Sequence, residues 1–142
     1  MTAEEYLGRA YQQQRRIEDL KMQVEVLRSA AERTGSVQYE EKVSHSLNTG
    51  AVEDSIVRLM ETEEKLKKAR IELVLRLADN IDMINKLEND KQRTILSRRY
   101  IGFENWTQIA DNMGYSTRWV RKQHAMAIDA LNRCEVSENG VL

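Results

Sequence analysis

The sequence predicts an all-α protein, in which a long, coiled-coil-like helical hairpin is followed by three shorter helices. Charged residues make up 32% of the 142 residues, aromatic residues only 6%, and proline is absent. This composition favours long, solvated helices over a sheet sandwich. Apolar residues recur at alternating intervals of three and four in the first two thirds of the chain, and helix-capping residues punctuate the last third.

The first expected helix covers residues 2–33. Its apolar or small residues form a heptad seam, with Gln13 as one polar position, and Leu7 and Tyr11 widen the stripe near its start. The seam consists of Ala3, Tyr6, Ala10, Gln13, Ile17, Leu20, Val24, Leu27 and Ala31.

Residues 34–50 lose this period and are rich in Gly, Ser, Thr and Asn, which predicts a loop. A second helix is expected over residues 51–87. Its seam runs through Val52, Ile56, Leu59, Leu66, Leu73, Leu77, Ile84 and Leu87, is interrupted by Glu63, Arg70 and Asn80, and is flanked by Met60, Ala69, Val74 and Ile81.

Two such helices can bury their stripes in an antiparallel hairpin of residues 1–89, or each can pair with a second chain. Both alternatives satisfy the heptads. Asn80 either fixes the register of this packing or lies at a solvated edge.

Two short helices are expected next. Residues 90–100 direct Ile95, Leu96 and Tyr100 inward, and Gly102 is expected to end this helix with a positive φ. Residues 105–113 begin with Asn105 as N-cap and have Gln108 at the capping-box position. The inner face of this second helix is formed by Ile109, Ala110 and Met113.

Gly114 and Tyr115 form the expected turn, and Ser116 caps a last helix over residues 117–133. Its inner face consists of Val120, Ala127, Ile128 and Leu131. Residues 90–133 therefore predict a three-helix helix-turn-helix domain, and residues 134–142 a tail.

The opposite face of the last helix presents Thr117, Arg118, Arg121, Lys122 and Ala125. This is the part of a helix-turn-helix that enters the DNA major groove. Arginine can donate two hydrogen bonds to guanine, whereas lysine more often neutralises a phosphate. The candidate DNA-binding set is completed by Ser116, Trp119, Arg98 and Arg99.

The charge distribution agrees with this prediction. Residues 1–90 hold 14 Lys and Arg against 18 Asp and Glu, whereas residues 91–133 hold 8 against 3, a net charge of +5. A basic end on an acidic body is expected when one end meets nucleic acid.

For several side chains the sequence allows a structural role in place of a role in DNA binding. Trp119 either stacks on DNA or packs, and Trp106 is expected in the core. Arg98 and Arg99 either bind phosphates or lie on a solvated face. His124 is expected to be structural. The acids Glu61, Glu63 and Glu64 are expected to form i,i+4 surface pairs with Lys65, Lys67 and Lys68.

No metal-ligand spacing, phosphate loop or catalytic set is found, so we expect neither a cofactor nor an enzyme. The single cysteine, Cys134, the missing signal segment and the missing apolar span predict a soluble, cytoplasmic protein with no membrane partner.

Residues 90–131 resemble the fourth conserved region of bacterial sigma factors. The resemblance is carried by Ile95, Leu96, Arg99, Tyr100, the run Trp106–Ala110, Met113, Gly114, Ser116, Arg118, Val120, Ala127, Ile128, Ala130 and Leu131. The whole chain resembles small phage regulators of the ArpU type, which implies control of late, packaging or lysis genes. Thr117 and Trp119 stand where sigma factors have a more charged helix start, so a different DNA sequence is expected. Promoter-melting regions are missing, so the chain is not expected to act as a complete sigma factor.

We therefore expect a transcriptional regulator that binds double-stranded DNA through the major groove, acts with host RNA polymerase or as a repressor, and forms a homodimer if the hairpin pairs between chains. Two alternatives are a packaging protein similar to a small terminase subunit, and an adaptor that binds RNA polymerase without DNA.

Overall fold

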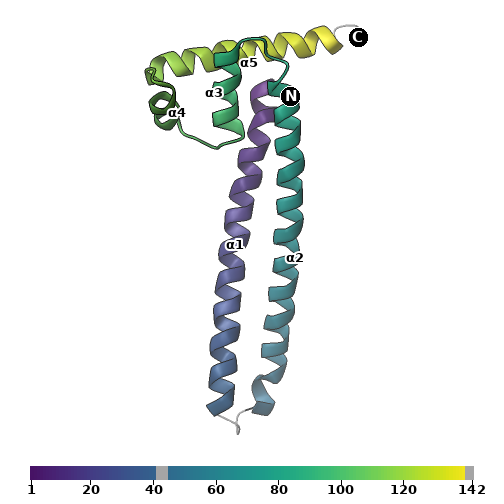
Figure 1. Ribbon diagram of the computed structural model, residues 1–142. Coiled ribbons are helices and arrows are strands. Elements are labelled where there is room, and N and C mark those ends of the chain that lie inside the picture. Colours follow the sequence, from purple (N-terminus) through teal and green to yellow (C-terminus); the bar gives the residue numbers. More distant parts are fainter. Residues whose placement is uncertain (41–44, 140–142) are drawn as a thin grey trace. The chain divides into compact units, whose positions relative to one another are not determined.

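The computed structural model describes the backbone of residues 1–40 and 45–139, and the side chains of residues 1–33 and 50–134. Within these ranges every regular element is a helix, so the predicted all-α fold is confirmed (Figure 1). The helices are α1 (Ala3–Glu40), α2 (His45–Ile84), α3 (Asp90–Tyr100), α4 (Trp106–Met113) and α5 (Thr117–Asn139).

Four predicted helix ends were wrong. Residues 34–40 and 45–50 are helical rather than loop, and residues 41–44 lie outside the described part. A glycine inside a helix costs only about 1 kcal/mol relative to alanine, so Gly35 and Gly50 do not end these long helices. Similarly, α5 continues through most of the predicted tail, because neither glycine nor proline occurs between Thr117 and Asn139. The C-terminal end of α2 is at Ile84, three residues before the predicted end.

The chain divides into two compact units, which differ from the predicted division after residue 89. The first unit contains Met1–Gln13 and Leu73–Leu142, and the second contains Gln14–Glu72. Thus α1 and α2 each contribute to both units. The unit that contains the three short helices also includes the first turns of α1 and the last turns of α2.

In the second unit, α1 and α2 lie side by side and run in opposite directions (Figure 1). The predicted seam of α1 is confirmed, since Ile17, Leu20 and Val24 are buried. On α2 two predicted seam positions were wrong: Ile56 is 43% exposed, and Ala69 is buried where the exposed Arg70 was expected. A helical stripe can step by three or by four residues, so the spacing after Leu66 does not decide which of the two is buried.

The predicted i,i+4 surface pairs on α2 were wrong: none of the ion pairs among the described residues joins Glu61, Glu63 or Glu64 to Lys65, Lys67 or Lys68. Glu63 bonds to Arg28 of α1, with 2.9 Å between Oε1 and Nη2, rather than to Lys67 on its own helix. This ion pair joins the two helices, and both partners remain partly exposed. Such pairs contribute at most about 1 kcal/mol.

The core of the first unit joins residues from four helices and the α2–α3 connection. It comprises Ala3, Leu7, Met83, Ile84, Leu87, Leu96, Tyr100, Ala127, Ile128 and Leu131, all buried. The first turns of α1 and the last turns of α2 therefore share a core with α3 and α5.

Asn80 is buried in this unit, so the predicted alternative of a solvated edge was wrong. Its Nδ2 donates to the carbonyl oxygens of Leu7, at 3.1 Å, and of Tyr100, at 3.2 Å. Tyr100 is the last residue of α3, where carbonyl groups lack an intrahelical donor. Asn80 thus caps α3 and holds it against α1.

Replacement of Asn80 should destabilise the first unit. Asn80→Ala removes both hydrogen bonds from a buried site and should lower the free energy of unfolding by about 1–3 kcal/mol, measured by urea titration with circular dichroism. Asn80→Asp should cost at least as much, because it places a carboxylate against two carbonyl oxygens. Asp82→Ala, at an exposed position of the same helix, should change stability by less than about 0.5 kcal/mol. An Asn80→Ala protein as stable as wild type would contradict this role.

Candidate nucleic-acid interface

The helices α3, α4 and α5 pack around a small apolar core of their own. Ile95, Ile109, Ala110 and Val120 are buried in it, and Trp106, Met113 and Trp119 pack against its edge. The predicted inner faces are confirmed, except that Met113 is only partly buried.

The predicted caps and turn are confirmed. Asn105 Oδ1 accepts a hydrogen bond from the Gln108 amide at 2.8 Å, and Gln108 Oε1 accepts one from the Asn105 amide at 2.9 Å. Gly114 ends α4 in the left-handed region, with φ of 77°. Ser116 Oγ accepts from the Trp119 amide at 3.1 Å and so caps α5. These local bonds set the angle at which α5 leaves α4.

Gly102 has a different role from the one predicted. Phe103, not Gly102, takes the positive φ, of 55°. A Cβ at Gly102 would lie 3.0 Å from the Arg98 carbonyl oxygen, so this glycine permits a close approach of the chain to the end of α3.

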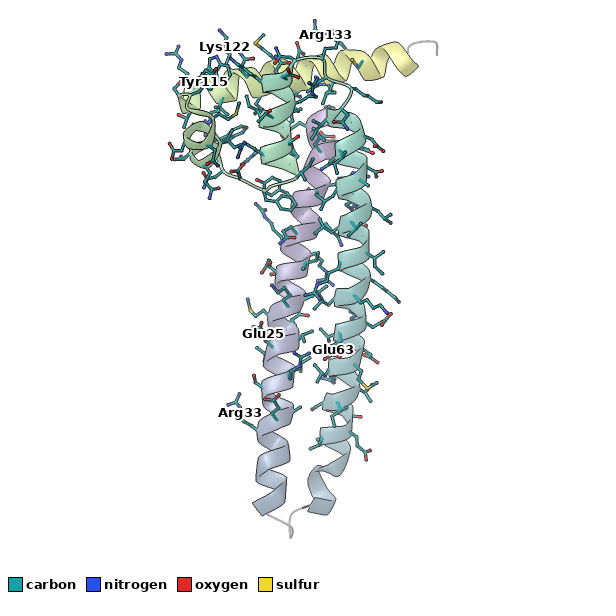
Figure 2. All side chains as sticks on the ribbon, in the orientation of Figure 1. Glu25, Arg33, Glu63, Tyr115, Lys122 and Arg133 are labelled. Carbon is teal, nitrogen blue, oxygen red and sulfur yellow. The ribbon has the colours of Figure 1, made fainter. Side chains whose placement is uncertain are left out.

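The predicted outer face of α5 is confirmed as exposed: Thr117, Arg118, Arg121, Lys122 and Ala125 all face solvent. None of its three cations forms an ion pair with a described residue. Figure 2 labels Tyr115 and Lys122 near the start of α5 and Arg133 further along it. Positive charge thus remains available at the start of this helix.

A shallow hollow lies between the starts of α4 and α5. It has a volume of about 380 Å³ and is lined by Trp106, Thr107, Thr117, Arg118 and Arg121. The guanidinium of Arg121 lies 5.6 Å from the centre of the Trp106 ring. Trp106 is only partly buried and forms one wall of the hollow, so the prediction of a core residue holds for part of its surface.

Arg98 and Arg99 are held inside the first unit, so their predicted alternative of a solvated face was wrong. Arg98 Nη1 lies 3.2 Å from Glu104 Oε2. Arg99 donates to the Glu104 carbonyl oxygen at 3.1 Å, and its guanidinium lies 4.4 Å from the centre of the Trp106 ring. Both side chains are half-buried, and these contacts use part of the donors that a phosphate would need.

Sequence reasoning missed Tyr115 and Lys91. Tyr115 stacks on Trp119, with ring centres 3.8 Å apart and planes at 17°. Lys91 Nζ, from the first turn of α3, donates to the Tyr115 hydroxyl at 2.6 Å. Trp119 packs against the small core on one side and carries this stack on the other. The spacing of four between Tyr115 and Trp119 was a usable signal, but the contact with Lys91 needs the tertiary fold.

His124 is structural, as predicted. It is buried, and its Nε2 shares a hydrogen bond of 2.7 Å with the Tyr100 hydroxyl. Burial, together with the nearby Arg99 charge, lowers the pKa of His124 to about 4. Burial also raises the pKa of Tyr100 above its ordinary value. Both groups are therefore neutral near pH 7.

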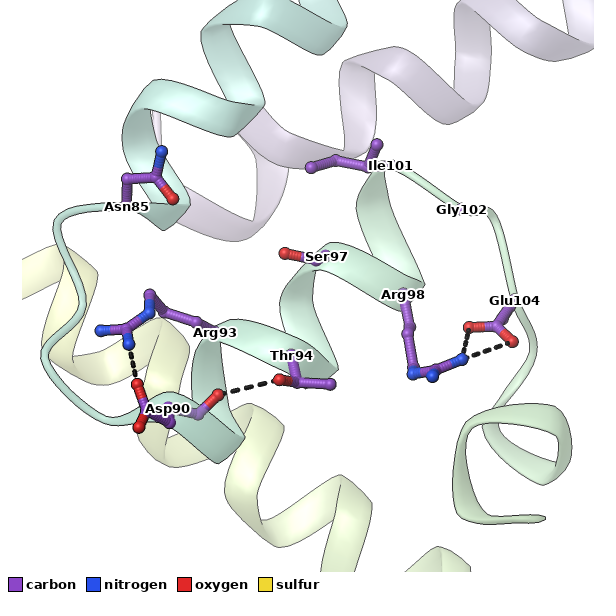
Figure 3. A pocket seen from close by; sticks show the side chains of 9 residues that line it. All are labelled: Asn85, Asp90, Arg93, Thr94, Ser97, Arg98, Ile101, Gly102 and Glu104. Carbon is purple, nitrogen blue, oxygen red and sulfur yellow. Dashed lines mark hydrogen bonds and ion pairs between the residues drawn. The ribbon is translucent and has the colours of Figure 1, made fainter. Parts of the chain in front are cut away.

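A larger hollow of about 700 Å³ lies along α3 (Figure 3). Its charged groups bond to one another: Arg93 to Asp90, and Arg98 to Glu104. Thr94 Oγ1 donates to the Asp90 carbonyl oxygen at 3.0 Å. Because these charged groups already bond to one another, they are poorly placed to bind a charged ligand in this hollow.

The described residues contain no cluster of His, Cys, Asp and Glu that could hold a metal ion. They also contain no helix that is long and apolar enough to cross a membrane.

The pKa of His124 predicts a stability change with pH. The folded protein binds the proton less well than the unfolded chain, whose histidine has a pKa near 6.5. The stabilisation is therefore complete above pH 6.5 and is lost as pH falls towards 4, by up to about 3 kcal/mol. Urea titrations at pH 7, 5.5 and 4 should show this loss in wild type and a smaller loss in His124→Gln. Equal pH dependence of the two proteins would contradict it.

Comparisons with known proteins give one match. The model of a family described as a protein of unknown function, DUF1492, matches residues 33–132, which include α3, α4 and the first 16 residues of α5. No curated protein and no solved structure matches. Because the matched segment covers well over half of the chain, this protein belongs to the DUF1492 family.

Proposed function

We propose that this protein is a sequence-specific DNA-binding transcriptional regulator that inserts the start of α5 into the major groove. The observation that carries the proposal is the exposed face of α5, where Arg118, Arg121 and Lys122 lie within about two turns and make no ion pair with a described residue. The capped turn at Gly114 and Ser116 presents this face.

Each side chain on the face suits one kind of contact. Arg118 and Arg121 are three residues apart and so share a helix face, from which guanidinium groups can donate to guanine O6 and N7. Lys122 suits a phosphate, because an ammonium is a point charge without a fixed planar geometry. Ala125 is small and exposed, which suits close approach to the methyl group of thymine.

The starts of α4 and α5 offer further contacts to the DNA backbone. The hollow between them places the Thr107 and Thr117 hydroxyls beside Arg118 and Arg121. Hydroxyl groups and arginines at helix starts are common phosphate ligands. A phosphate in this hollow would fix the register of α5 along the groove.

The biological setting of the proposal rests on the resemblance to phage regulators of the ArpU type and to the fourth region of sigma factors. In that setting the protein acts in the bacterial cytoplasm on late, packaging or lysis genes, beside host RNA polymerase. The DUF1492 match neither adds to this setting nor opposes it, because the description of that family names no function.

Substitutions on α5 should weaken DNA binding selectively. A duplex is first selected from a random-sequence pool with the wild-type chain. For that duplex, Arg118→Ala and Arg121→Ala should each reduce affinity by roughly 1–3 kcal/mol, or about 5- to 150-fold, measured by fluorescence anisotropy. Lys122→Ala should weaken binding to all duplexes by a similar factor. It should also reduce the slope of log K against log salt by about 1.

Arg133→Ala is the matched control, because Arg133 is exposed on the same helix but lies about two turns or more beyond the proposed contacts. It should leave affinity within twofold of wild type. Failure to enrich any sequence from the pool would overturn the proposal, and so would unchanged affinities of both arginine variants for an enriched duplex. Capture of RNA polymerase in that case would favour the adaptor, and a large ring in light scattering would favour the packaging protein.

A further inference from the structure

An exposed apolar stripe lies on α2, on a different face from its buried residues. Met60 is 64% exposed, Ile71 54% and Val57 51%, whereas Leu66 and Ala69 on the same helix are buried. Large apolar side chains gathered on one exposed face are characteristic of interaction surfaces.

The stripe has its own heptad spacing. Positions 57, 60, 64, 67 and 71 alternate intervals of three and four, and Val74, 64% exposed, continues the pattern along the same helix. Glu64 and Lys67 occupy the two central positions. Both are exposed, and neither forms an ion pair with a described residue.

The charges around the stripe change sign at its centre. Between Met60 and Ile71, acidic residues come first, at 61, 63 and 64, and basic residues follow, at 65, 67, 68 and 70, whereas Arg58 and Glu72 lie just outside this stretch with the opposite signs. A helix with this order is complementary to a second copy of itself that runs in the opposite direction. In a parallel pair, Glu64 would instead meet Glu64 and Lys67 would meet Lys67.

We propose that two copies of this chain pair through this α2 stripe, antiparallel, about a two-fold axis between Lys65 and Leu66. Glu64 of one copy then faces Lys67 of the other, and Met60 faces Ile71. Val57 faces Val74 at each end, so the contact extends over 17 residue steps, about 26 Å of helix. Glu61 of one copy lies diagonal to Lys68 of the other.

Apolar and charged parts of this interface have separate roles. The burial of Met60, Ile71 and the valines supplies the affinity. The two Glu64–Lys67 contacts add little affinity, because desolvation offsets the attraction, but they select the antiparallel direction. This pairing does not depend on DNA binding, and its test uses no DNA.

The first experiment is sedimentation equilibrium of the full chain at micromolar to submillimolar concentrations. Wild type should approach the mass of two chains as concentration rises. Met60→Glu combined with Ile71→Glu should remain a monomer with unchanged helical content, since both positions are exposed in the single chain. Met22→Glu, at a 62% exposed position of α1 in the same unit, should dimerise like wild type. A wild-type chain that stays monomeric, or a Met60→Glu, Ile71→Glu chain that still dimerises, would overturn the proposal.

Charge exchange tests the pairing of Glu64 with Lys67. Glu64→Lys and Lys67→Glu should each weaken the dimer by about tenfold or more, because each puts like charges together. The double variant should restore it. Loss of the dimer in the double variant would contradict this pairing.

Cysteine cross-linking tests the direction in a Cys134→Ser background, which removes the single native cysteine. A mixture of Met60→Cys and Ile71→Cys chains should form a disulfide-linked heterodimer under mild oxidation, and neither chain alone should. Efficient cross-linking of Met60→Cys with itself would show a parallel pair and overturn the proposed arrangement.

Discussion

The first unit depends on one buried amide. Asn80 donates to the carbonyls of Leu7 and Tyr100, and so joins α1, α2 and the end of α3 at a single point. Tyr100 in turn shares a hydrogen bond with His124 of α5, and the His124 ring lies edge-on to Trp106 of α4, with ring centres 4.8 Å apart. A continuous chain of directional contacts therefore leads from the last turns of α2 to the helix that carries the exposed cations. Apolar packing alone would allow α5 to slide or rotate, whereas these hydrogen bonds and ring contacts form only at one position of α5.

The parts of the structure that could be predicted are those determined by neighbouring residues. The capping box at Asn105, the left-handed Gly114 and the Ser116 cap each depend on residues within four positions, and all are as expected. The phase error at Ala69 and Arg70 has another origin, because both residues follow Leu66 at a spacing that a helical stripe allows, and only the tertiary packing decides between them. The partners of Asn80 could not be predicted, since Leu7 and Tyr100 lie 73 and 20 residues away. Nor could the contact of Arg99 with Trp106, which belongs to another helix.

Composition gives the net positive charge of the C-terminal third, but it does not show which of the basic side chains already have partners within the protein. Of the eight cations between residues 91 and 133, Arg93 and Arg98 form ion pairs, and Arg99 lies over the Trp106 ring. Lys91 binds the Tyr115 hydroxyl. The cations on the outer face of α5, Arg118, Arg121 and Lys122, are thus a minority of the basic residues. In the proposed complex such a small set gives modest affinity for each chain, and a dimer would increase it by engaging two sites at once.

The most direct test of the central proposal is a nitrogen-15 NMR titration of the full chain with a duplex selected for binding. The account predicts that the largest amide shift changes lie in residues 116–125 and at the start of α4, with little change along residues 57–74 of α2. Changes confined to the hollow along α3 or to α2, with residues 116–125 unaffected, would contradict the assignment of α5 as the helix that reads DNA.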